Sequence, residues 1–151
     1  AQLLHDSLKK LGHHGAFRVV LIHHPPIHNS TAWHKRLLGG SRFRAVIRDA
    51  GAELVLHGHT HKRSINWIGD VPVIGVPAAS NAAHRHGSAF NLFEISGETG
   101  KWDCEMIERG LTGPTEPVRE IDRRFLYRDG RIQGAPTTTG AETAETDDPE
   151  A

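Results

Sequence analysis

Cysteine is almost absent from this sequence of 151 residues, and long apolar runs are missing. The single cysteine, Cys104, cannot form a disulfide within the chain, so nothing indicates an oxidising compartment and cytoplasm is the expected location. No apolar run approaches the roughly 20 residues that a membrane-spanning helix needs, so we expect no membrane partner. The first ten residues contain neither an initiator Met nor the apolar stretch of a signal peptide, and we expect the chain to begin inside a larger protein.

Charge is balanced overall but unevenly distributed along the chain. Residues 1–49 hold eight Lys or Arg against two acids, whereas residues 134–151 hold five acids and no base. The basic excess suits an anionic substrate, and solvated helix faces explain it equally well. No specific nucleic-acid partner is expected, because the basic residues are not interleaved with aromatics and match no known module. Residues 134–151 have few core-forming side chains, which predicts a disordered acidic tail.

The first half of the chain alternates predicted helices with short apolar strands. Leucines spaced at i, i+4 and i+7 predict a helix over residues 1–11. Residues 17–22 end in four consecutive apolar side chains, which predicts a central strand buried on both faces. Ser41 is a plausible N-cap of a second helix that ends before Gly51, and residues 53–56 form another apolar strand. This order is typical of an α/β protein.

The second half is richer in strands. Four segments have strand-like composition with turn residues between them, namely 64–68, 71–76, 89–95 and 102–107. The glycines at 97 and 100 are expected to turn a hairpin between the last two. After Pro117, the spacing of Val118, Ile121 and Phe125 predicts a final short helix.

Both apolar strands of the first half run directly into a histidine motif, HHPP at 23–26 and HGHTH at 57–61. Ligand sites of open α/β sheets lie at the carboxyl ends of strands. If residues 59–61 are extended, His59 and His61 project to the same side, and His23 from the neighbouring strand end can join them. Neutral imidazoles are good ligands for zinc and other transition metals, so the pattern predicts a metal site. A lone HxH is common in proteins, and HHPP alone is also compatible with a capped turn.

Gly58, inside the second motif, permits a tight turn or a close backbone approach just before the two histidines. An apolar strand ending in HHPP, about 35 residues before an apolar strand ending in GHTH, resembles the last two metal motifs of the calcineurin-like metallophosphoesterases. The similarity covers about residues 1–110 and is nearest to the branch of cyclic-nucleotide and glycerophosphodiester phosphodiesterases.

The resemblance implies roles for individual histidines. His23, His59 and His61 match the metal ligands of the family. His24 is expected to orient the loop or a ligand, and His57 to be a buried, hydrogen-bonded group behind the ligands. Two further histidines in the loop after HHPP, His28 and His34, are candidates for substrate contact, with a solvated loop as the alternative.

The resemblance also implies an architecture. The expected fold is the C-terminal half of a four-layer α/β sandwich, in which two mixed β-sheets are flanked by helices. Residues 1–110 would form the C-terminal part of the phosphoesterase domain, 111–133 a C-terminal extension, and 134–151 the acidic tail.

The implied function is hydrolysis of a small phosphoester, as a phosphodiesterase, by a hydroxide that two divalent ions (Mn, Fe, Zn or Co) activate. The family's N-terminal motifs, DxH, GD and GNH, have no counterpart in this sequence, although they supply the bridging carboxylate. The longer protein is therefore expected to be an enzyme that needs its missing N-terminal half as a partner, and this chain alone to be inactive. The alternative function is a non-catalytic metal-binding module.

Overall fold

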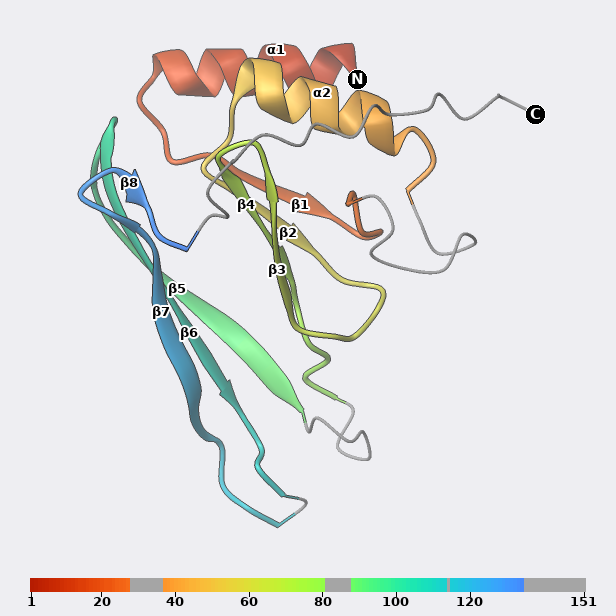
Figure 1. Ribbon diagram of the computed structural model, residues 1–151, viewed down its shortest axis with the longest axis vertical. Coiled ribbons are helices and arrows are strands. Elements are labelled where there is room, and N and C mark those ends of the chain that lie inside the picture. The colour runs from red at the N-terminus through yellow and green to blue at the C-terminus, as the bar shows by residue number, and fades with distance from the viewer. Residues whose placement is uncertain (28–36, 81–87, 114, 135–151) are drawn as a thin grey trace.

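The computed structural model describes residues 1–27, 37–80, 88–113 and 115–134 (Figure 1). Two helices and eight strands follow one another along these residues. They are α1 (Gln2–His13), β1 (Val19–Ile22), α2 (Gly40–Ala50), β2 (Leu54–His57), β3 (Ser64–Ile68), β4 (Val71–Gly75), β5 (Ala89–Glu98), β6 (Lys101–Gly110), β7 (Arg119–Arg128) and β8 (Arg131–Ile132). Neither of the two helices is long and apolar enough to cross a bilayer.

The first sheet is mixed and has the strand order β1-β2-β4-β3. Strands β1, β2 and β4 are parallel, and β3 pairs antiparallel with β4. Helices α1 and α2 lie side by side over one face of this sheet (Figure 1). The core between helices and sheet is built from Leu8 and Ile47 of the helices and Val20, Val55 and Val73 of the strands. The apolar stripe of each amphipathic helix is therefore what holds it on the sheet.

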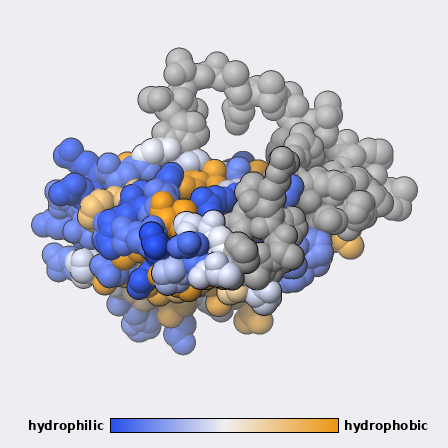
Figure 2. All heavy atoms as spheres, turned by 90° about the horizontal axis from the view of Figure 1, so that it is seen from below, coloured by the Kyte–Doolittle hydropathy of each residue, from blue (hydrophilic) through white to orange (hydrophobic). Residues whose placement is uncertain are grey.

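The second sheet is antiparallel, in the order β5-β6-β7-β8, and lies on the other side of the first sheet (Figure 1). Leu54 and Ile74 of the first sheet pack against Cys104, Met106 and Leu126 of the second. The predicted α/β class with two stacked sheets is thus confirmed, and the described residues supply three of the four expected layers: helices, mixed sheet and antiparallel sheet. Seen from below in Figure 2, the described part of the surface is mostly hydrophilic, with hydrophobic residues in small groups.

The thiol of Cys104 lies in the core between the two sheets, where it is fully buried. Burial raises its pKa to about 11, so almost none of it is thiolate at neutral pH. We expect a disulfide reagent such as DTNB to leave Cys104 unmodified in the native protein and to label it fully in denaturant. A native labelling rate close to that of free cysteine would mean that the two sheets do not pack as described.

In strand β1 the described residues cover only one face, which corrects the expectation that this strand is buried on both faces. Val20 is buried under the helices, but Val19 is 41% exposed and Leu21 is 76% exposed. Strand β1 is an edge strand of its sheet, and among the described residues the buried core between the two sheets contains no β1 side chain. Strand β2, by contrast, is buried on both faces as expected. An apolar run thus indicates that a strand can be buried on both faces. Whether both faces are buried depends on the helices and strands that pack against it.

The helix expected after Pro117 is a strand, β7, and this prediction was wrong. Residues 119–128 pair antiparallel with β6, with register shifts on either side of the central pairs. Leu126 and Tyr127 are buried there against the first sheet. The spacing of three apolar residues fits a helix, but seven of the ten residues of β7 pair with the free edge of β6, and tertiary pairing overrides the local signal. Strands β7 and β8 lie within the predicted extension 111–133, and the domain boundaries themselves stay a prediction.

Candidate metal centre

The two histidine motifs meet because their strands are parallel neighbours. Strand β1 pairs with β2 so that Ile22 lies opposite His57. The residues that follow the two strands therefore leave the sheet at the same edge, where the carboxyl ends of the parallel strands lie. The backbone N–H of Gly58 donates a hydrogen bond to the carbonyl of His23 at 3.2 Å, which ties the two exits together.

Three imidazoles come together at this edge. Nε2 of His23 lies 3.0 Å from Nδ1 of His59. The ring of His24 lies 4.9 Å from that of His23 and 4.5 Å from that of His59, measured between centroids. One nitrogen from each of the three rings lies within 4.8 Å of the other two. His23 is exposed and the other two are half-buried, so solvent and ions can reach the cluster.

These three side chains fit a transition-metal ion. A tetrahedral zinc ion with bonds of about 2.0–2.1 Å holds its nitrogen ligands about 3.3–3.4 Å apart. The separation of 3.0 Å between His23 Nε2 and His59 Nδ1 is close to that value, and a nitrogen of His24 lies within 4.8 Å of both rings' ligand atoms. Three neutral ligands leave a fourth position open, which is the pattern of exchangeable and catalytic zinc sites.

His61 is not part of this group, although the sequence places it among the ligands. The backbone explains the difference. His59 has φ 64° and His61 has φ 55°, so both are left-handed and the segment is not extended. The same-side projection expected from strand alternation therefore does not apply. His24 occupies the place in the cluster that His61 was expected to take, and the assignment of His61 as a ligand stays a prediction.

Gly58 does not have the steric role that the sequence suggested. A Cβ at this position would meet only the carbonyl oxygen of His23, at an ordinary 4.0 Å. The unusual backbone conformation falls instead on His59 and His61, which are not glycines. Non-glycine residues rarely adopt positive φ, and where they do the surrounding structure holds them there.

His57 lies at the end of β2 with 4% of its surface exposed. Its Nδ1 donates to the carbonyl of Gly58 at 3.2 Å, as expected for a buried, hydrogen-bonded group. Nε2 is buried and has no hydrogen-bond partner among the described residues. Burial lowers the pKa of His57, so the ring is neutral at physiological pH. The two loop candidates, His28 and His34, fall outside the described residues.

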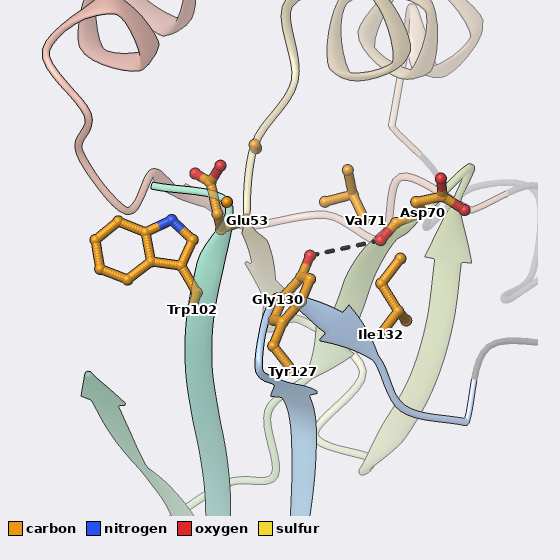
Figure 3. Close-up of a pocket in the computed structure, with 9 residues that line it drawn as sticks. Glu53, Asp70, Val71, Trp102, Tyr127, Gly130 and Ile132 are labelled. Carbon is orange, nitrogen blue, oxygen red and sulfur yellow. Dashed lines mark hydrogen bonds between the residues drawn. The ribbon is translucent and has the colours of Figure 1, made fainter. Parts of the chain in front are cut away.

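A cavity of about 220 Å³ lies at the opposite end of β2 from the histidines (Figure 3). Trp102, Tyr127 and Ile132 of the second sheet line it, together with Glu53 and Asp70 from the first. Oη of Tyr127 donates to the backbone carbonyl of Asp70 at 3.4 Å. Sequence analysis did not indicate this cavity, because its residues come from five separate segments with no shared motif.

Of the comparisons with known proteins, only the one with solved structures bears on the fold. No family model matches the chain, and no curated protein matches it. Among solved structures, it is similar to Vps29 from Entamoeba histolytica in complex with Zn²⁺, with a TM-score of 0.50 and 20% identity over 75% of this chain and 57% of that one. Vps29 from Chaetomium thermophilum is also similar, with a TM-score of 0.46 and 14% identity over 77% of this chain and 57% of that one.

The similarity to the E. histolytica structure shows a metallophosphoesterase-like fold, as found in Vps29. The expected two-sheet α/β fold is therefore confirmed, and membership of the superfamily stays a prediction. The chain spans a little over half of the length of the Vps29 structures that it matches. At this level of identity the comparison concerns the fold alone.

Proposed function

We propose that this chain is a metal-binding module with a metallophosphoesterase-like fold, which binds a divalent transition-metal ion at the histidine cluster and does not hydrolyse phosphoesters by itself. The single observation that carries the proposal is the convergence of His23, His24 and His59, with ring nitrogens within 4.8 Å of one another. Nitrogen donors of this kind favour Zn²⁺, Fe²⁺ or Co²⁺ over Mg²⁺ and Ca²⁺. The E. histolytica Vps29 structure contains Zn²⁺, which makes zinc a reasonable first ion to test.

The expected lack of catalysis has an electrostatic reason. Two ions about 3.5–4 Å apart repel each other strongly unless a carboxylate or hydroxide bridges them. The group of potential ligands in the described part of the chain contains three imidazoles and no carboxylate. Neutral rings cannot offset a second positive ion, so we expect the isolated chain to bind one.

Calorimetric titration of the purified chain with Zn²⁺ tests metal binding, and hydrolysis of bis(p-nitrophenyl) phosphate with added Mn²⁺ or Zn²⁺ tests catalysis. We expect about one ion per chain and no turnover above that of metal and buffer. A wild-type chain that binds no transition metal would contradict the proposal. Turnover that His59→Ala abolishes would show that the chain carries a complete catalytic centre.

A second candidate function is favoured by the free edge of β1, where Leu21 is 76% exposed. In this hypothesis a longer protein supplies an N-terminal segment that covers this edge and brings the carboxylates of a two-metal phosphodiesterase. Two divalent ions, when bound, supply the hydroxide that attacks phosphorus. His59 and His61 would then each hold a different ion, and His23 would complete one coordination shell.

The partner in this second hypothesis is a polypeptide segment, and the substrate is a small phosphoester. Coexpression with the upstream part of the reading frame, followed by the same phosphodiester assay, distinguishes it from the first. The cytoplasmic location and the cyclic-nucleotide or glycerophosphodiester branch stay predictions from the sequence.

A further inference from the structure

An ion pair joins the segment after the second histidine motif to the second sheet. Nη2 of Arg63 lies 2.6 Å from Oε1 of Glu108. Arg63 is the last residue before β3, and Glu108 lies in β6. The side chain of Glu108 is 4% exposed and that of Arg63 is 48% exposed. Glu108 is thus buried in the interior, while Arg63 lies at the end of segment 58–63, which carries His59 and His61.

Glu108 is in a costly position for a carboxylate. Strand alternation places it on the same face of β6 as Cys104 and Met106, which pack against the first sheet. Its register partners, Asn91 and Asp122, bring no positive charge. Replacing a buried ion pair by apolar residues is often neutral or stabilising, whereas removing one partner leaves an uncompensated charge. The pair is therefore poorly explained as a source of stability.

Segment 58–63, by contrast, has a backbone conformation that contacts with the rest of the protein must stabilise. His59 and His61 both have left-handed backbones, an unfavourable conformation for a side chain with a Cβ. Within the segment, the N–H of Thr60 donates to the carbonyl of Gly58 at 2.8 Å, which tightens the turn between them. Two such conformations within three residues persist only where the surroundings fix both ends of the segment. The bond from Gly58 to His23 fixes the first end. At the second end Ser64 pairs with Gly75 of β4, and the ion pair joins the neighbouring Arg63 to Glu108 in the second sheet.

We propose that Glu108, acting through Arg63, is a positioning residue for the metal centre: it holds segment 58–63 in the conformation that places His59 against His23 and His24. Glu108 itself is not a ligand and lies outside the cluster. The inference rests on the proposed metal-binding function and adds to it an element of the second sheet that controls the geometry of the site.

The test compares Glu108→Gln with Glu105→Gln in the full chain. Glu105 is the matched control, because it lies on the same strand and pairs with Arg123 at 2.7 Å, with side chains 17% and 44% exposed. We expect Glu108→Gln to weaken Zn²⁺ binding by about 10–100-fold, the usual effect of losing a group that orients a ligand. Glu105→Gln should leave Zn²⁺ binding unchanged.

Variants of Arg63 separate positioning from a general loss of structure. Arg63→Lys keeps the positive charge and should retain most of the affinity, while Arg63→Met should match the loss in Glu108→Gln. The double variant Arg63→Met with Glu108→Gln should bind Zn²⁺ no more weakly than the single variant with the lower affinity, because both substitutions remove the same contact. Additive losses would mean that the two residues act separately, and the proposal would be wrong.

Amide hydrogen exchange of segment 58–63 in the metal-free protein gives a readout that does not depend on zinc. We expect faster exchange there in Glu108→Gln and wild-type exchange in Glu105→Gln. If the wild-type chain binds no zinc, the proposed function fails while exchange still decides whether Glu108 holds the segment. Unchanged exchange in Glu108→Gln, or an equal change in both variants, would overturn the inference.

Discussion

Replacing His59 by alanine is expected to weaken Zn²⁺ binding by more than about 100-fold, beyond the range seen when only a supporting residue is lost. His59 is the central member of the cluster, since its Nδ1 lies 3.0 Å from Nε2 of His23 and its ring stacks near that of His24. Its removal leaves two imidazoles, too few to compete with water for the ion. His23→Ala should have a comparable effect. Calorimetric titration with Zn²⁺ measures both.

The same titration distinguishes the ligands that the structure brings together from those that the sequence pattern predicts. If the observed cluster is the binding site, His24→Ala should weaken Zn²⁺ binding strongly and His61→Ala only slightly. If the ligands are instead those that the family resemblance implies, His61→Ala should weaken Zn²⁺ binding strongly and His24→Ala only slightly. His14, an exposed residue just after α1, provides the control, and His14→Ala should bind zinc as the wild type does. Equal binding by all five alanine variants would contradict a metal site at this edge.

The meeting of His23 and His59 at one edge could be predicted from the sequence because it depends on local features. Two short apolar runs each end at a histidine motif, and parallel pairing of the runs brings the motifs to one edge. The identity of the third imidazole could not be predicted, because it depends on backbone torsion. Left-handed backbone at His59 and His61 turns the segment away from the extended form that the residue spacing suggests.

The parts of the fold that were mispredicted share a different cause. Strand β7 replaces the helix expected after Pro117 because the edge of β6 offers pairing that no local pattern records. The contact of Glu108 with Arg63 likewise joins residues 45 positions apart in the chain. Such long-range contacts decide between local alternatives of similar free energy, so a single sequence read segment by segment does not reveal them.

Matched leucine truncations on neighbouring strands should have very different effects on stability. Leu54 on β2 is 1% exposed and packs between the two sheets, whereas Leu21 on β1 is 76% exposed. We expect Leu54→Ala to lower the free energy of unfolding by about 2–5 kcal/mol, from lost burial and the cavity that remains. Leu21→Ala should change it by less than about 0.5 kcal/mol, as for most surface substitutions. Denaturant unfolding of the isolated chain measures both.

The comparison of Leu54→Ala with Leu21→Ala also tests whether the exposed face of β1 stays solvent-accessible in solution. Val19 and Leu21 form an apolar strip beside an open sheet edge, an arrangement that favours pairing with another strand. If a second copy covers the strip, Leu21→Ala should become destabilising as protein concentration rises, and Leu21→Gln should reduce self-association in sedimentation experiments. A cost for Leu21→Ala near that of Leu54→Ala at every concentration would mean that the chain buries this strip itself. The interpretation of β1 as a free edge awaiting a partner strand would then be wrong.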